Sequence, residues 1–130
     1  MRKAFLLTGG NIGNRPENLS TALRLVEKHC GKLLQTSSLY KTAAWGLKEQ
    51  PDFYNQVLVL KTALSPQQLM DKLLMIEAQM GRKRKEKMGP RVIDIDILLI
   101  EDLVMDEPLL HIPHPRLPQR RFALTPLAEV

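Results

Sequence analysis

The sequence predicts a ferredoxin-like α+β sandwich, in which two helices cover one face of an antiparallel sheet. Three observations predict it. Two stretches with helical spacing alternate with apolar, β-branched stretches in the order β-α-β-β-α-β. Glycine, proline and serine mark the ends of these stretches. No repeat, low-complexity segment or linker divides the 130 residues, so we expect one domain over residues 1–130 with a short C-terminal extension.

The first strand is expected over Lys3–Thr8 and runs into a glycine-rich loop, residues 9–14. This loop has two interpretations: a backbone wall around a ligand, or a tight strand-to-helix turn. The first helix opens with Pro16-Glu17 and stops at Gly31. We expect this helix, including Cys30, to serve packing only.

The second strand is expected over residues 32–42, and its one face carries Leu34, Thr36, Ser38 and Tyr40. Residues 43–54 then have the character of a loop, which contains the single tryptophan and two other aromatic residues. Aromatic residues gathered in a loop indicate stacking on a flat ligand. The alternative is a loop that its aromatic residues anchor in the core. The third strand is expected over Asn55–Thr62.

The second helix is expected over residues 65–80. Ser65 and Gln68 have the spacing of a capping box, and Gly81 stops the helix. The buried stripe of this helix comprises Leu69, Leu73, Ile76 and Met80. Glu77 lies at the edge of that stripe, a position where a glutamate is typically solvated.

A strongly basic segment follows this helix, with five bases among the six residues 82–87. A charge run of this kind is usually a solvated surface. Here it leads within a few residues to two aspartates, and arginines beside a metal-binding acid pair are typical of phosphoryl transfer. We therefore interpret the segment as a phosphate-binding loop.

The two aspartates lie in the most apolar and β-branched stretch of the chain, residues 89–100, which predicts a strand near the middle of the sheet. Alternation places Asp94 and Asp96 on one face, with Cα atoms about 6.5–7 Å apart. The two faces comprise Val92, Asp94, Asp96, Leu98 and Ile100 on one side and Ile93, Ile95, Ile97 and Leu99 on the other. The two carboxylates repel each other unless a cation compensates, and Mg²⁺ suits such an oxygen pair.

The last part of the chain contains a turn, a short edge strand over residues 103–105, a proline-punctuated extended segment over 108–118 and one helical turn over 119–124. His111 and His114 have a possible zinc spacing, but no third ligand is obvious. A histidine that donates to a phosphate is the favoured interpretation.

The composition is that of a soluble globular protein, with 44% hydrophobic and 25% charged residues. The apolar runs are too short for a membrane span, and the first apolar run ends too early for a signal peptide. The single cysteine cannot form an internal disulfide, which favours the cytoplasm. The net charge of +5 favours an anionic partner, for which nucleotide and nucleic acid both qualify.

Two main hypotheses follow. The first is an enzyme that transfers a phosphoryl-type group from a nucleotide, with Asp94 and Asp96 holding Mg²⁺. The second is a ferredoxin-like nucleic-acid-binding module, which requires aromatic residues on its central strands. The only aromatic residue of the predicted strands one, three and four is Phe5, and the two acids would repel the phosphates of a nucleic acid. The first hypothesis is therefore favoured. A regulatory domain without chemistry is a third and weaker interpretation.

Several short motifs occur in order along the chain: Gly9-Gly10-Asn11-Ile12-Gly13-Asn14, Gln50-Pro51-Asp52-Phe53-x-Asn55, Gly81-Arg82-x-Arg84, Gly89-Pro90-Arg91-x-Ile93-Asp94-Ile95-Asp96-Ile97-Leu98, Ile112-Pro113-His114-Pro115 and Arg120-Arg121-Phe122. Together they resemble the 6-hydroxymethyl-7,8-dihydropterin pyrophosphokinase family of folate biosynthesis. The resemblance runs from about residue 5 to about residue 128. The chain departs from the usual family pattern at Ala43-Ala44-Trp45, Met88 and Leu109, and it ends at Val130, where family members usually continue.

The resemblance implies transfer of pyrophosphate from ATP, the co-substrate, to the hydroxymethyl oxygen of the pterin, releasing AMP. It implies a cytoplasmic enzyme without nucleic-acid or membrane partners, expected to be a monomer. Asp94 and Asp96 would bind two Mg²⁺ ions, and the other catalytic residues would be Arg82, Arg84 and Arg91. The nucleotide-binding residues would be Glu77, Arg82, Arg84, Arg91, Ile97, His111, His114 and Arg120. The pterin-binding residues would be Thr42, Ala43, Ala44, Trp45, Phe53, Asn55 and Phe122.

Overall fold

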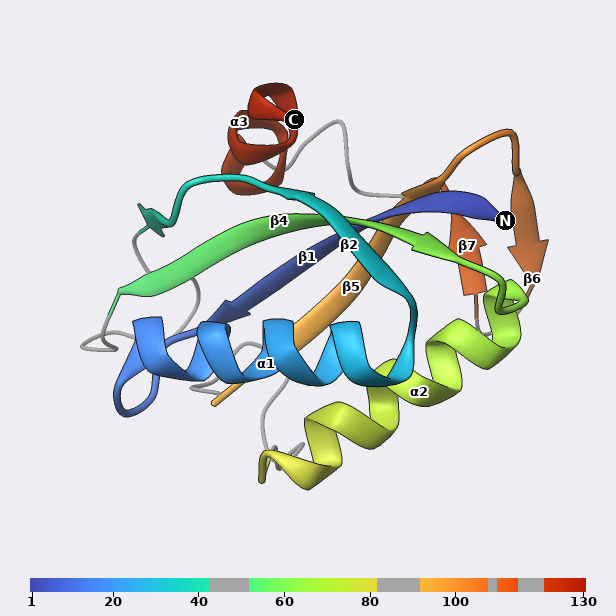
Figure 1. The fold of residues 1–130 in the computed structure, drawn as a ribbon. Helices are drawn as coiled ribbons and strands as arrows, with labels where there is room; N and C mark the ends of the chain where they lie inside the picture. The colour runs from blue at the N-terminus through green and yellow to red at the C-terminus, as the bar shows by residue number, and fades with distance from the viewer. Residues whose placement is uncertain (43–51, 82–91, 108–109, 115–120) are drawn as a thin grey trace.

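The fold was analysed in a computed structural model, which describes residues 1–42, 52–81, 92–107, 110–114 and 121–130. These residues form a mixed α/β structure with one five-stranded antiparallel sheet, a two-stranded sheet and three helices (Figure 1). In chain order the elements are β1 (Arg2–Gly10), α1 (Arg15–His29), β2 (Lys32–Thr36), β3 (Tyr40–Thr42), β4 (Phe53–Thr62), α2 (Pro66–Gln79), β5 (Asp94–Ile100), β6 (Met105–Glu107), β7 (Leu110–Ile112) and α3 (Arg121–Glu129).

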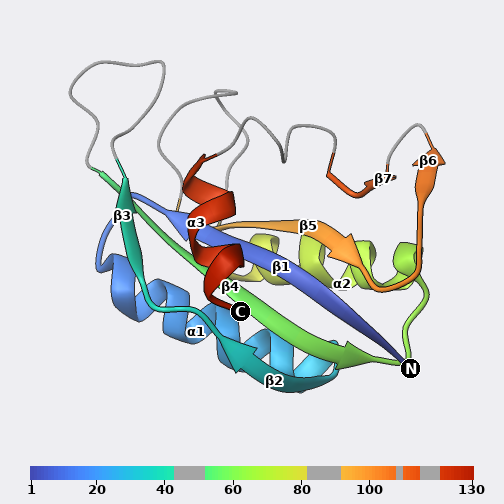
Figure 2. The ribbon, with the colours of Figure 1, turned by 90° about the horizontal axis from the view of Figure 1, so that it is seen from above.

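The main sheet has the strand order β2-β4-β1-β5. Strand β3 also pairs with β4, at the N-terminal end of β4, whereas β2 pairs with its C-terminal half. Helices α1 and α2 cover one face of this sheet, while α3 lies on the other face (Figures 1 and 2). The predicted ferredoxin-like sandwich with both early helices on one face is therefore confirmed. Helix α3 adds a partial third layer, because it extends well beyond the single helical turn that the sequence predicted.

The apolar core of the described residues consists of two clusters, one on each face of the sheet. The large cluster lies between the sheet and the helices α1 and α2, and it includes Leu6, Leu58 and Ile76. The small cluster comprises Leu7, Val57 and Leu98, with Leu127 and Val130 of the C-terminal region packed against it. Burying apolar side chains on both faces keeps the sheet fixed between its helical layers.

Local signals set the helix ends as the sequence predicts. At α2, the Ser65 Oγ accepts a hydrogen bond from the Gln68 N–H at 3.2 Å, and the Gln68 Oε1 accepts one from the Ser65 N–H at 2.9 Å. This reciprocal pair is the predicted capping box. Gly81 follows the helix with a φ of 87°, a conformation that favours glycine after a helix.

The predicted strand over residues 32–42 is divided into β2 and β3. Ser37 causes the break: its N–H donates to the Val57 oxygen, while its side-chain Oγ accepts the Val57 N–H, both at 2.9 Å. A hydroxyl thus replaces a main-chain carbonyl in the ladder, so the strand cannot continue through this position. The prediction that Phe53 and Tyr54 belong to the preceding loop is also wrong, since both pair within β4.

Among the strands that the structure describes, β1 alone pairs with β5, so β5 lies at the edge of the main sheet and not near its middle. Its apolar character arises from packing on both faces. A β-bulge also shifts its register, since Leu6 pairs with Ile97 while Phe5 pairs with Leu99. The extra residue reverses the alternation, so Leu99 packs against the small cluster and Ile100 lies in the large one, opposite to the prediction.

The region after β5 differs from the prediction in its boundaries. Leu103 forms only an isolated bridge with Ile100, and the short edge strand is β6, Met105–Glu107, which pairs with β7. Strand β7 contacts β5 and covers part of its open edge. None of the helices that the structure describes is long and apolar enough to cross a membrane.

The end of α3 is tied to the β2–β3 connection. The Glu129 carboxylate accepts hydrogen bonds from the Tyr40 hydroxyl at 2.6 Å and from the Ser38 N–H at 2.8 Å. The Ser38 hydroxyl donates a third at 3.1 Å. These contacts hold α3 against the sheet face that it covers.

Candidate active site

Three adjacent strands carry the candidate site. In β1, Gly9 pairs with Asn55 of β4 on one side and with Asp94 of β5 on the other. Leu7, two residues earlier, pairs with Asp96. Directly paired residues of an antiparallel sheet point to the same face, and Leu7 packs in the small cluster on the α3 side. Asn55, Asp94 and Asp96 therefore lie on the face of the sheet that α3 partly covers.

Gly9 is required by the close approach of Asn55. A Cβ atom at Gly9 would lie 2.6 Å from the Asn55 Oδ1, which is closer than such atoms can approach. Asn55 is 4% exposed, so its side chain occupies the space that the glycine leaves open. Gly9 and Gly10 belong to β1 and not to the predicted loop, and Gly9 accommodates a polar side chain there.

The two aspartates have the exposure and chemistry that Mg²⁺ requires. Both are partly exposed on the same face of an edge strand. Mg²⁺ usually keeps several waters and takes one or two carboxylates together with substrate phosphates. Among the described residues, no group of three or more His, Cys, Asp or Glu side chains could hold a metal ion. A pair of carboxylates completed by a nucleotide fits Mg²⁺, and it does not fit a structural zinc site.

Two predicted pterin-binding residues lie beside Asn55. Phe53 is partly buried in the same strand and has the same side-chain direction as Asn55, because it is two residues away. Thr42 of β3 pairs with Phe53, as Tyr40 pairs with Asn55. The β-ladder thus brings residues of the predicted pterin and metal sets onto one surface.

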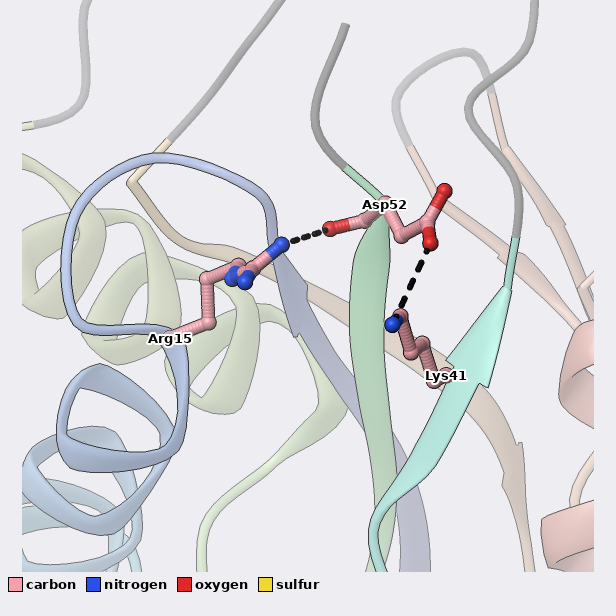
Figure 3. Close-up of polar contacts among 3 residues, drawn as sticks. All are labelled: Arg15, Lys41 and Asp52. Atoms are coloured by element: carbon pink, nitrogen blue, oxygen red, sulfur yellow. Dashed lines mark hydrogen bonds and ion pairs between the residues drawn. The ribbon is translucent and has the colours of Figure 1, made fainter.

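A polar cluster fixes the start of β4 next to these residues (Figure 3). Arg15, at the start of α1, donates a hydrogen bond to the Asp52 carbonyl oxygen at 3.0 Å, and Lys41 lies 3.6 Å from the Asp52 carboxylate. The Arg15 guanidinium also lies over the Tyr54 ring, 4.8 Å from its centre. Sequence reasoning missed this cluster, since no local spacing relates residues that are 37 positions apart.

The chain matches a family model and several named relatives. The family model of 7,8-dihydro-6-hydroxymethylpterin-pyrophosphokinase (HPPK) matches residues 5–130. The chain belongs to the HPPK family. It is 41% identical over 130 residues to 2-amino-4-hydroxy-6-hydroxymethyldihydropteridine pyrophosphokinase of Aquifex aeolicus, covering 100% of this chain and 81% of that protein. It is 38% identical over 128 residues to the protein of the same name from Bacillus subtilis, covering 98% of this chain and 77% of the relative.

A likeness to a solved structure supports the HPPK fold. The structure of Plasmodium falciparum HPPK-DHPS, wild type with SDX-DHP, has a TM-score of 0.74 and 20% identity, and the match covers 100% of this chain. This chain corresponds to 40% of that longer protein. The family membership makes this chain an enzyme, a pyrophosphokinase of folate biosynthesis and thus a transferase. The nucleic-acid-binding alternative gains no support.

Glu77 differs from the solvated glutamate that its position predicted. It is 4% exposed, and its Oε2 accepts a hydrogen bond from the Ile95 N–H at 2.7 Å. Ile97 has its side chain in the large core cluster, on the face opposite to Asp94 and Asp96. The structure therefore separates both side chains from the surface that carries Asn55, Asp94 and Asp96.

The two histidines occupy different environments beside β5. The His114 N–H donates to the Leu98 oxygen at 2.7 Å, which places His114 along the outer edge of β5. The His111 Nδ1 lies 2.7 Å from the Asp106 Oδ1, across the β6–β7 pair. His114 thus lies beside β5, the strand of the candidate metal pair, whereas His111 belongs to the β6–β7 pair.

The remaining candidates lie outside the residues that the structure describes. They are Ala43, Ala44, Trp45, Arg82, Arg84, Arg91 and Arg120. Phe122 lies in the first turn of α3 and Thr42 in β3. Their roles in an HPPK enzyme remain predictions from the sequence motifs.

Proposed function

We propose that this chain catalyses the Mg²⁺-dependent transfer of pyrophosphate from ATP to the hydroxymethyl oxygen of 6-hydroxymethyl-7,8-dihydropterin, with AMP as the second product. Membership of the HPPK family and the names of its relatives support this reaction. The single observation that carries the proposal is the register in which Gly9 lies between Asn55 and Asp94. Asn55 and Asp94 share one face of the sheet with only Gly9 between them, which supports a pterin contact and a metal ligand acting in one site.

In the proposed reaction, the pterin hydroxyl oxygen attacks the β-phosphorus of ATP. The bond from this phosphorus to the oxygen that bridges to the α-phosphate breaks, and AMP leaves with that oxygen. The hydroxyl proton passes to solvent, because we assign no residue as general base. Two Mg²⁺ ions bound at Asp94 and Asp96 would neutralise the triphosphate charge and acidify the attacking hydroxyl.

The protein contributes by positioning the two substrates. On the pterin side, a flat bicycle would stack between Phe53 and Phe122, while Asn55 reads its hydrogen-bonding edge. Thr42 and residues 43–45 would line the same side. On the nucleotide side, the basic residues Arg82, Arg91, His111, His114 and Arg120 would bind phosphates, and Arg84 would join them when the basic segment closes.

We further propose that the enzyme acts as a monomer in the cytoplasm on free small molecules, without a nucleic-acid or membrane partner. The lone cysteine, Cys30, is buried, and burial raises the pKa of its thiol to about 11, although the charge of Lys72 opposes this. A thiol with this pKa is unreactive at neutral pH. Light scattering of the purified protein tests the oligomeric state.

The decisive assay mixes the protein with Mg²⁺, ATP and hydroxymethyl-dihydropterin and identifies the nucleotide product. AMP is expected, whereas ADP would indicate an ordinary kinase. Asp94→Asn and Asp96→Asn should each lower turnover by about 100-fold or more, because each removes a metal ligand. Asp102→Asn is the matched control: this exposed acid follows β5, and its φ of 57° suits asparagine. Near-normal activity of both ligand variants would refute the metal assignment.

A further inference from the structure

We infer that Glu77 is a positioning residue for the Asp94–Asp96 pair, acting from beneath the strand that carries it. This inference rests on the proposed function, in which those aspartates hold Mg²⁺. It replaces the expectation that Glu77 contacts the nucleotide. It is argued from the contact between the Glu77 carboxylate and the main chain of Ile95, the residue between the two aspartates.

The location of Glu77 is costly for a carboxylate. It lies in the last turn of α2, where the helix dipole disfavours negative charge, and only 4% of it is exposed. The next residues, Ala78 and Gln79, are exposed. A glutamate at either position would be solvated at no such cost. The buried position therefore requires a compensating interaction, which the Ile95 N–H supplies in part.

That interaction acts on the peptide unit that joins Asp94 to Ile95. The Ile95 N–H donates to the Glu77 Oε2 at 2.7 Å, a short bond of the charge-assisted type. Strand β5 pairs with β1 along one edge, and on its other edge the His114 N–H donates to the Leu98 oxygen, three residues after Ile95. Glu77 provides an acceptor from α2, so the strand is also held to a helix at the point where the aspartates project.

Such support determines how well the pair can bind a cation. The register with β1 sets Asp94 opposite Gly9 and Asp96 opposite Leu7, but an edge strand with a bulge a few residues later can shift or twist. Loss of a group that orients metal ligands typically lowers metal affinity by about 10- to 100-fold. Glu77 performs this role through the backbone.

The test uses two substitutions at Glu77 with different consequences. Glu77→Gln keeps a side-chain oxygen that can accept the Ile95 N–H, whereas Glu77→Leu removes the acceptor and keeps the volume. Two controls lie on the same helix. Asp71→Asn removes an exposed charge, and Leu73→Ala destabilises the large cluster by about 2–5 kcal/mol without touching the Ile95 contact.

The measurements are the affinity for a non-hydrolysable ATP analogue, by calorimetry with and without Mg²⁺, and amide hydrogen exchange at Ile95. In Glu77→Leu, we expect the Mg²⁺-dependent gain in affinity to fall about tenfold or more while metal-free binding is unchanged. Exchange at Ile95 should rise. Glu77→Gln should restore most of both properties, and both controls should keep the Mg²⁺-dependent gain.

Three outcomes would overturn the inference. An equal loss of affinity with and without Mg²⁺ in both Glu77 variants would identify a direct nucleotide contact. An equal loss of the Mg²⁺-dependent gain in Leu73→Ala would show that the loss in Glu77→Leu comes from lower stability of the fold. An unchanged Ile95 exchange rate in Glu77→Leu would show that the hydrogen bond from Ile95 to Glu77 does not stabilise this part of β5. If the wild-type protein itself shows no Mg²⁺-dependent binding, the proposed function fails, and the exchange measurement alone still tests the Glu77 contact.

Discussion

Replacing Gly9 with alanine should affect both pterin affinity and fold stability, and the two effects can be measured separately. The added Cβ would lie 2.6 Å from the Asn55 Oδ1, while a C···O contact needs about 3.3 Å, so one atom must move by about 0.7 Å. The nearest main-chain atom, the Tyr54 oxygen, lies at 3.5 Å and is not in conflict. The strain therefore falls on the buried Asn55 amide.

Two free-energy effects follow from this displacement. Overpacking a buried position typically costs 1–3 kcal/mol, so the free energy of unfolding should fall by about 1–2 kcal/mol. A displaced Asn55 would also bind the pterin less well, by about 1–2 kcal/mol, which corresponds to roughly a 5–30-fold higher Kd. Pterin fluorescence titration measures the second effect, and urea denaturation measures the first.

Gly31→Ala is the matched control for this experiment. There the added Cβ would lie 2.2 Å from the Lys61 carbonyl oxygen, a main-chain clash, so this variant should be the less stable of the two. Gly31 follows α1 at the end of the sheet remote from Asn55, so the folded Gly31→Ala protein should bind pterin normally. Unchanged pterin affinity in Gly9→Ala, or an equal loss in both variants, would refute the reasoning.

Three further predictions concern other parts of the chain. Ser65→Ala should lower the free energy of unfolding by about 1 kcal/mol in urea denaturation, because it removes half of the capping box. Hydrogen bonds from Tyr40, then Ser38, hold the pKa of Glu129 below its ordinary value of 4.5. The Glu129 carboxylate therefore stabilises the fold fully at a pH above its unfolded-state pKa. This stabilisation is lost as the pH falls through the lower pKa of the folded state. Glu129→Gln should remove this part of the dependence of the Tm on acidic pH. Arg84→Ala should lower kcat more than it raises the KM for ATP; an effect on ATP binding alone would contradict the closing of the basic segment.

Local features of the sequence determined much of this protein. The capping box at Ser65 and the stop at Gly81 depend on neighbours within a few residues, so spacing alone located α2 correctly. The alternation around Asp94 and Asp96 placed both on one face, because the period of a strand is a local property. The ordered motifs identified the family, which the comparisons confirm.

Only the tertiary structure decided how distant residues meet. The bulge that reverses Leu99 and Ile100, and the edge position of β5, follow from pairing with β1, which no local pattern encodes. The burial of Glu77 depends on how α2 packs against β5. The sequence pattern predicted a solvated glutamate there, but in the structure its carboxylate accepts a hydrogen bond from the Ile95 N–H. Long-range pairing and packing set register, burial and edge exposure, and these decide which side chains share a surface.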